Sequence, residues 1–271
     1  MLDNKISVPS LFWKERKLIR TLAKNDFKTK FAGSYLGIVW AMVQPIVTVL
    51  VYWFVFQIGL RQTATFGDNC PFVLWMLAGL VPWFYFQEFM VSGTNVLLEY
   101  SYLVKKVVFK IEILPIVKMI SASFIHVFFI CLTLILFGIY GLFPGAYAIQ
   151  VIYYTVCMML LTLGICYVTS AVAVFFRDLL QIVNIALQMG VWITPIMWNM
   201  DDIKIPGILQ ILLKLNPMYY IVYGYRDALV YKVWFWERPE QTLYFWIFTI
   251  LCFVLGTRIF RRLRVHFADV M

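Results

Sequence analysis

Between Lys118 and Arg177 the chain carries no aspartate, glutamate, lysine or arginine. A single α-helix of that length would be roughly 85 Å long, nearly three times the thickness of the hydrocarbon core of a bilayer. The stretch must therefore hold two membrane spans, and the glycines and proline within residues 138–145 mark an uncharged turn between them. This pattern predicts an all-α, polytopic membrane protein.

The composition supports this class and excludes others. Of 271 residues, 63% are hydrophobic and only 14% are charged, which a soluble globular domain of this size would not tolerate. The net charge of +9 does not indicate nucleic acid binding, because the basic residues are spread along the chain as membrane topology requires. The five cysteines are isolated and indicate neither a disulfide framework nor a metal site.

Apolar runs and their breaks predict a single transmembrane domain, residues 1–271, with six spans. The expected spans are residues 31–60, 71–98, 119–143, 146–176, 179–200 and 241–257. An amphipathic interfacial helix is expected at residues 10–30, before the first span. Two short helices that re-enter the outer leaflet are expected within residues 203–232, separated at Asn216-Pro217.

Residues 97–115 form a basic island between the second and third spans. Lys105, Lys106 and Lys110 lie there, while the apolar residues recur at helical spacing. The pattern predicts an amphipathic helix along the cytoplasmic surface, which is a natural contact for a soluble partner. The distribution of basic residues places both termini in the cytoplasm.

The chain contains no ATPase site. No glycine is followed by lysine, so the phosphate-binding loop of a P-loop ATPase is absent from the sequence. If the protein is a pump, its energy comes from another polypeptide.

Several polar residues are candidates for chemistry. Glu88, inside the second span, either pairs with a basic residue of the interfacial helix or takes part in gating. Adjacent acids at Asp201-Asp202 suit either a divalent ion or a solvated helix end, and the second is favoured. His126 and His266 have no ligand-spaced neighbours and are expected to be packed or interfacial. No metal site is predicted.

Aromatic residues inside the spans are candidates for a substrate path, because sugar rings stack on aromatic faces. The alternative is packing or contact with lipid. With Glu88, the candidates are Tyr52, Trp53, Phe56, Trp83 and Trp192. Three basic residues are expected at the level of the inner headgroups: Lys28, Lys30 and Arg177. They either bind an anionic diphosphate or only reflect the excess of basic residues on the cytoplasmic side.

Ordered motifs along most of the chain resemble the type-2 ABC exporter permeases of polysaccharides, O-antigens and wall teichoic acids. Residues 28–40 (KTKFAGSYLGIVW) with Gln44-Pro45 are similar to the start of that family's first span. Residues 175–178 (FFRD), 215–217 (LNP) and 225–229 (YRDAL) continue the match in the same order. Residues 79–84 (GLVPWF) are closer to the teichoic acid members.

The resemblance implies a homodimer of permeases bound to two copies of a separate nucleotide-binding subunit, which supplies ATP and Mg and does the hydrolysis. The cargo would be a polyprenyl-diphosphate-linked polymer, passed outward across a bacterial cytoplasmic membrane along the first and fifth spans. Contact with the ATPase would fall on Glu99, Tyr100, Leu103, Lys105, Lys106 and Lys110. The short outer helices, with Asn216, Pro217, Arg226 and Asp227, would sit by the exit.

Other classes remain open from the residues alone. A drug or small-lipid exporter would share the superfamily. A polyprenyl-dependent glycosyltransferase or lipid phosphatase would need an acid or histidine cluster, for which only Asp201-Asp202 is available. A voltage-gated channel is disfavoured, because no span repeats arginine at every third position.

Overall fold

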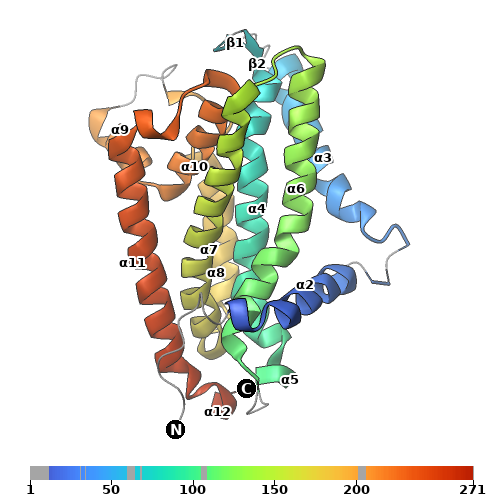
Figure 1. Cartoon of the computed structure of the whole chain (residues 1–271), viewed down its shortest axis with the longest axis vertical. Coiled ribbons are helices and arrows are strands. Elements are labelled where there is room, and N and C mark those ends of the chain that lie inside the picture. The colour runs from blue at the N-terminus through green and yellow to red at the C-terminus, as the bar shows by residue number, and fades with distance from the viewer. Residues whose placement is uncertain are drawn as a thin grey trace.

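The computed structural model describes residues 12–30, 32, 33, 35–59, 65–67, 69–104, 109–200 and 206–270. Long helices run side by side along the longest axis of the molecule, and one helix lies across their lower end (Figure 1). That crossing helix is α2, Arg16–Lys30. It lies within the predicted interfacial segment and buries only Ile19, Ala23 and Asp26, so a single narrow stripe faces the bundle.

Within the described residues, five helices are long and apolar enough to cross a membrane, which confirms the all-α polytopic class. The first is α3, Val39–Trp53, which continues as the π-helix η1, Phe54–Gly59. The others are α4, Phe72–Glu99; α6, Leu114–Ile139; α7, Gln150–Phe175; and α11, Pro239–Arg264. Short 3-10 turns precede three of them: η2, Ile111–Ile113; η3, Gly145–Ile149; and η6, Phe235–Glu237.

The prediction of a fifth span over residues 179–200 is wrong in its length. The helix there, α8, is Leu179–Ile193 and has 15 residues. At about 1.5 Å per residue it is roughly 22 Å long, short of the hydrocarbon core. It ends because Pro195 forces the residue before it out of the helical region, and Thr194 adopts φ −73°, ψ 126°.

The predicted continuous helix over residues 97–115 is also wrong. α4 runs to Glu99, a four-residue helix α5 follows at Ser101–Val104, and α6 begins at Leu114. Tyr100, at φ −98° and ψ 29°, ends α4. Lys105 and Lys106 lie outside the described residues. The last span is longer than predicted, because α11 includes the arginines that were expected to follow it.

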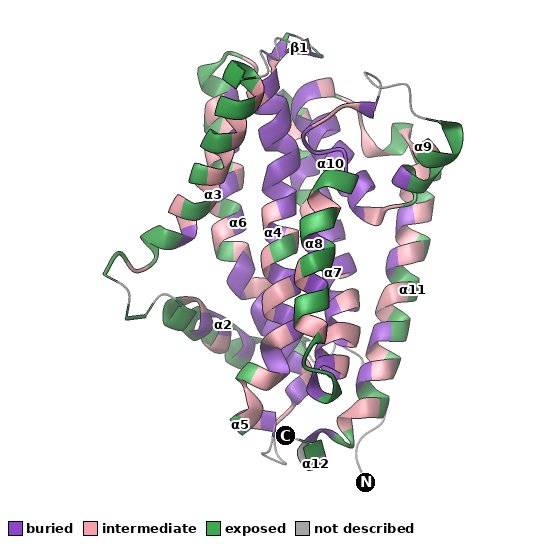
Figure 2. Ribbon diagram, turned by 180° about the vertical axis from the view of Figure 1, so that it is seen from behind, coloured by how far each residue is buried: buried purple, intermediate pink, exposed green. Residues whose placement is uncertain are grey.

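α4 occupies the centre of the bundle. In Figure 2 it is the most continuously buried of the long helices, with α6 and α7 beside it. The apolar residues of α4 are spread around the whole helix, as in a buried span, and Trp75 and Phe89 are fully enclosed. By contrast, Ala41 is the sole buried residue of α3. The bundle therefore has one firm centre and one loosely packed helix at its side.

α7 and α11 approach each other through two glycines. A Cβ atom on Gly256 would lie 2.2 Å from the carbonyl oxygen of Gly164. Helices in a membrane gain contact mainly by close packing, which small residues allow. These glycines therefore fix the distance between the two spans.

The outer segment breaks where the sequence predicts. α9, Gly207–Lys214, is followed by α10, Pro217–Arg226, and by the π-helix η5, Asp227–Tyr231. Asn216 caps α10, since its side chain accepts a hydrogen bond from the Met218 amide at 3.0 Å. Every residue of α10 from Met218 to Arg226 is buried, so α10 belongs to the core and is not a lipid-facing helix.

The two ends of the bundle differ. A two-stranded pair, β1 at Thr65–Phe66 and β2 at Cys70–Pro71, lies at the same end as α9 and α10 (Figure 1). At the opposite end lie α5 and the last short helix, α12, Phe267–Val270. We call these the β1 end and the α5 end.

Candidate transport cavity

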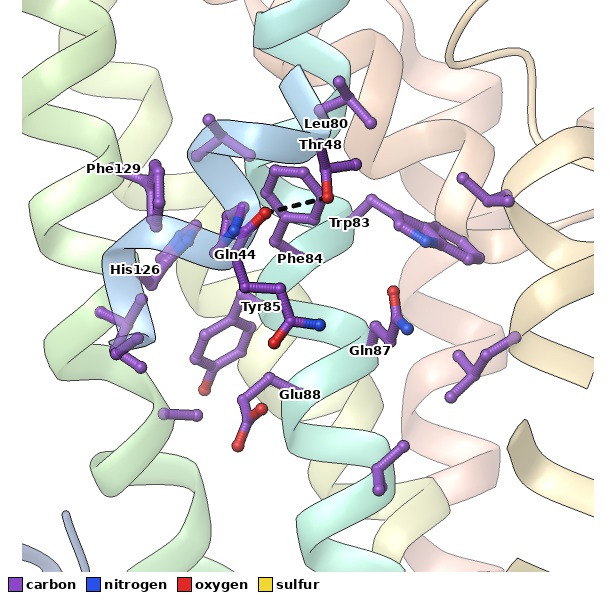
Figure 3. Close-up of a pocket in the computed structure, with 18 of the residues that line it drawn as sticks. Gln44, Thr48, Leu80, Trp83, Phe84, Tyr85, Gln87, Glu88, His126 and Phe129 are labelled. Carbon is purple, nitrogen blue, oxygen red and sulfur yellow. Dashed lines mark hydrogen bonds between the residues drawn. The ribbon is translucent and has the colours of Figure 1, made fainter. Parts of the chain in front are cut away.

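A cavity of about 970 Å³ lies among α3, α4, α6 and α8. Four of the predicted path residues line it: Tyr52, Trp83, Glu88 and Trp192. Figure 3 shows the wall formed by α4, where Trp83, Phe84, Gln87 and Glu88 follow one another around the helix. The structure therefore brings together residues from three separate helices that the sequence nominated one by one.

Two nominated residues lie elsewhere. Trp53 and Phe56 are not among the residues that line the cavity. Phe56 packs instead against Phe72 at 5.7 Å between ring centroids, next to the stacked pair of Phe66 and Trp75. These two side chains therefore lie outside this cavity: Trp53, the next residue after Tyr52, points to another side of the helix, and Phe56 lies one turn further along, where it packs on Phe72.

The lining combines aromatic faces with uncharged polar groups. Amides come from all sides except α6: Gln44, Gln87, Asn184 and Gln188. The charged side chains among the described lining residues are Lys30 and Glu88. Such a surface suits a ligand with hydroxyl groups and apolar C–H edges. The sequence prediction does not include these amides, although Asn184 and Gln188 recur at i, i+4 in a helix whose one further amide is Gln181.

Glu88 pairs with Lys30 at one end of the cavity. The pair joins the second span to the interfacial helix, as one of the two predictions for Glu88 has it. The pair is partly exposed, so its contribution to stability is small. Of the three basic residues nominated for a diphosphate, only Lys30 lines the cavity; Lys28 and Arg177 are exposed elsewhere.

A second charged cluster lies between α2, α4 and α6, and its centre is the buried pair of Lys118 and Asp26. The Lys118 ammonium donates to Asp26 at 2.6 Å and lies 2.8 Å from a carboxylate oxygen of Glu99. The Tyr100 hydroxyl donates to Asp26 at 2.7 Å. Burial, the bond to Asp26 and the nearby carboxylates raise the pKa of Tyr100, which keeps its proton and remains a donor.

Further ion pairs fasten the same region. Lys110 donates to Glu15, the residue just before α2, at 2.7 Å, and Arg264 of α11 pairs with Glu112. Three residues nominated for ATPase contact, Glu99, Tyr100 and Lys110, therefore also bind other parts of this chain. The sequence signals for the cluster were Lys118, the last charge before the uncharged stretch, and the isolated acid Asp26 in a basic helix.

The nominated residues of the outer helices hold the end of α8 in place. Arg226 is completely buried and donates to the carbonyl oxygens of Pro195 at 2.7 Å and Ile196 at 2.6 Å. Its guanidinium stacks 3.4 Å from the centre of the Trp75 ring. Asn216 donates to Thr194 at 2.8 Å. These side chains support the cavity wall and do not line it.

Asp227 is also buried and makes an ion pair outside the cavity. Its carboxylate lies 2.9 Å from the Arg238 guanidinium. The pair joins η5 to the start of α11.

A bundle of membrane-length helices around a cavity, tied together by charges at one end, defines a polytopic membrane transport subunit. The match to the ABC-2 type transporter family extends over residues 17–230, and the chain belongs to this family.

Two curated relatives are similar along most of the chain. The O-antigen export system permease protein RfbA of Myxococcus xanthus is 29% identical over 217 residues, which cover 80% of this chain and 81% of that protein. A protein of the same name from Klebsiella pneumoniae is 25% identical over 260 residues, covering 94% of this chain and 95% of that protein.

Proposed function

We propose that the chain is the permease of an ATP-driven exporter that moves a polyprenyl-diphosphate-linked cell-surface polysaccharide outward across a bacterial cytoplasmic membrane. The observation that carries the proposal is the cavity of about 970 Å³, with aromatic faces and uncharged amides between the spans. The similarity to O-antigen export permeases supports the same class of cargo.

The lining favours a glycan over the polyol-phosphate chain of a teichoic acid. A polyanion would need several cations along its path, and Lys30 is the cationic residue among the described residues that line the cavity. Aromatic faces and amides match sugar rings and hydroxyls. The resemblance to teichoic acid permeases at residues 79–84 stays a prediction.

The working unit is a homodimer with two ATPase subunits. α3 and α8 border the cavity and expose apolar side chains such as Val47, Leu50, Ile182 and Met189. A second copy that covers these side chains would close the cavity into a path. The segment from Glu99 to Lys110, at the α5 end, is the contact for the ATPase, which holds the ATP and Mg.

The ion pairs supply a route for mechanical coupling. A force on the segment around Lys110 reaches α2 through Glu15, and α2 is joined to the cavity through Lys30 and Glu88. The buried Asp26–Lys118 pair fixes α2 against α6 between those two points. Movement of the segment would therefore be passed to the entrance of the cavity.

The test is reconstitution of the permease with its ATPase in lipid vesicles. A polyprenyl-diphosphate-linked oligosaccharide is expected to stimulate ATP hydrolysis, and alanine at Trp83 or Trp192 is expected to weaken the stimulation while basal hydrolysis stays unchanged. Alanine at the exposed residue Trp236 of η6 is the control. Stimulation by small amphiphilic drugs and not by the oligosaccharide would favour a drug exporter instead.

A membrane glycosyltransferase is less well supported. No group of three or more histidine, cysteine, aspartate or glutamate side chains that could hold a metal ion occurs among the described residues. The acid pair Asp201-Asp202 lies outside them. Polymer export that persists with alanine at both positions would remove this alternative.

A further inference from the structure

His126 of α6 is a buried polar residue in the wall of the cavity. The side chain is 3% exposed and lies 4.8 Å, centre to centre, from the ring of Tyr85. Figure 3 shows both residues in the wall between α6 and α4. Nε2 has hydrogen-bond partners, but Nδ1 has none among the described residues. Buried polar atoms are normally paired, so an atom without a partner among the described residues, on a residue that lines a cavity, is a candidate contact for a ligand.

A chain of hydrogen bonds has one consistent direction of donation that places the proton of this imidazole. The Thr155 hydroxyl donates to the carbonyl oxygen of Val151 at 2.7 Å. Its oxygen is then the acceptor for the Tyr225 hydroxyl at 2.5 Å, because a phenol is a better donor than an aliphatic alcohol. The Tyr225 oxygen is left to accept from His126 Nε2 at 2.9 Å.

With donation in this direction, the imidazole is the Nε2–H tautomer. A neutral imidazole that donates through Nε2–H carries a lone pair on Nδ1 and no proton there. Nδ1 is thus an acceptor only. It can bind a hydroxyl or an amide N–H, and it repels an ionised phosphate, which has no proton to donate.

We propose that His126 Nδ1 accepts a hydrogen bond from a sugar hydroxyl of the transported polymer. This inference rests on the proposed function and assigns one contact within it. The surrounding amides have both donors and acceptors and accept many orientations of a glycan. His126 adds a position that requires a donor, so it distinguishes the sugar portion of the cargo from its diphosphate.

Access to Nδ1 comes from the loosely packed side of the cavity. The atom is covered in the present structure. α3, which forms the neighbouring wall with Gln44 and Thr48, has a single buried residue and is therefore the lining helix least fixed by contacts within this chain. The sugar reaches His126 as the polymer fills the cavity.

The tautomer can be measured directly, because the whole chain has two histidines. In the permease–ATPase complex labelled with ¹⁵N-histidine, and with His266→Gln to leave one signal, we expect the Nε2–H tautomer. A polyprenyl-diphosphate-linked oligosaccharide should shift the Nδ1 resonance, whereas polyprenyl diphosphate without sugar should not. An Nδ1–H tautomer, an imidazolium, or equal shifts with both probes would overturn the inference.

A matched pair of variants tests the contact by function. His126→Gln places an amide near Nε2 and keeps the bond to Tyr225, while His126→Asn places an amide near Nδ1. We expect His126→Gln to raise the oligosaccharide concentration for half-maximal ATPase stimulation about threefold to tenfold, the range for one neutral hydrogen bond, and His126→Asn to stay closer to the parent.

The outcomes separate this inference from the proposed function. If the parent complex is not stimulated by the oligosaccharide, the proposed function fails. If the parent is stimulated and both variants respond like it, or lose the response equally with normal thermal stability, the His126 contact is rejected and the exporter assignment stands.

Discussion

The ammonium of Lys118 lies 2.6 Å from the carboxylate of Asp26, in a site where both side chains are almost fully covered. The two residues belong to α6 and α2, far apart in the sequence. A buried ion pair of this kind holds an amphipathic helix against a membrane span at one defined point. The pair makes α2 part of the bundle. Hydrophobic periodicity alone predicts only that α2 lies on the membrane surface.

Breaking this pair should destabilise the protein strongly. Asp26→Asn leaves the Lys118 ammonium with Glu99 as its remaining close carboxylate, and Lys118→Met leaves Asp26 uncompensated. We expect Lys118→Met to cost about 3 to 5 kcal/mol, the usual range for removal of one buried partner. The measurement is thermal unfolding of the purified permease in detergent. A loss below about 1 kcal/mol would show that water reaches the site.

The pair of Lys30 and Glu88 should matter for coupling and not for stability. Both side chains are partly exposed, so either single charge reversal should change stability by less than about 1 kcal/mol. We expect Lys30→Glu or Glu88→Lys to reduce substrate-stimulated ATP hydrolysis, and the double reversal to restore it. A double variant as defective as the worse single variant would argue that the two charges do not act through each other.

Arg226 should be required for the position of α8. Arg226→Met removes the donors to Pro195 and Ile196, while Arg226→Lys keeps the charge but loses the planar fork and the stacking on Trp75. Both variants should unfold at lower temperature, with a loss of about 1 to 3 kcal/mol from the unpaired carbonyl oxygens. Arg177→Met, at an exposed position, is the control. Normal stability of Arg226→Lys would mean that charge alone suffices.

Close packing of α7 and α11 should not tolerate a methyl group. Gly256→Ala would place a carbon 2.2 Å from the Gly164 carbonyl oxygen, and the two helices must move apart. Overpacking of this kind costs about 1 to 3 kcal/mol. Gly138→Ala meets no atom within 4 Å and provides the matched comparison in the same assay. Equal stability of the two variants would contradict the assigned contact.

Charge reversal of Lys105 and Lys106 should uncouple ATP hydrolysis from transport. These residues lie in the segment assigned to the ATPase contact, so the variant should bind less ATPase while the permease remains folded. ATP hydrolysis and polymer transport in the reconstituted complex measure the coupling, while copurification with the ATPase and circular dichroism of the permease measure binding and folding. Full coupling in the double variant would remove the lysine pair from the interface.

The pattern of apolar runs predicted most helices, because each span must satisfy its own backbone hydrogen bonds inside the bilayer. The break at Asn216-Pro217 was also predictable, because a helix-capping residue and a proline act on the helix that begins beside them in the sequence. The length of α8 was misjudged because residues after Pro195 remain apolar although the helix has ended. The helix over residues 97–115 was misjudged because its apolar spacing is shared by three shorter pieces.

The candidate site was recoverable only in part. Residue type predicted Tyr52, Trp83 and Trp192 as lining residues, and they line the cavity. Trp53 and Phe56 were predicted by the same criterion and lie outside it. Orientation around a helix depends on which neighbours it packs against. Those neighbours come from distant parts of the chain, so the local sequence does not reveal them.

The sequence by itself determined that this chain crosses a membrane, where most of its spans lie, and that it contains no P-loop motif for ATP. These follow from hydrophobicity, capping and proline chemistry, which act over short distances. The tertiary structure alone decided that Asp26 meets Lys118, that Arg226 supports α8, and that His126 presents an unpaired nitrogen beside a cavity. Each of these depends on residues brought together from distant helices, and their pairing is fixed only when the whole bundle packs.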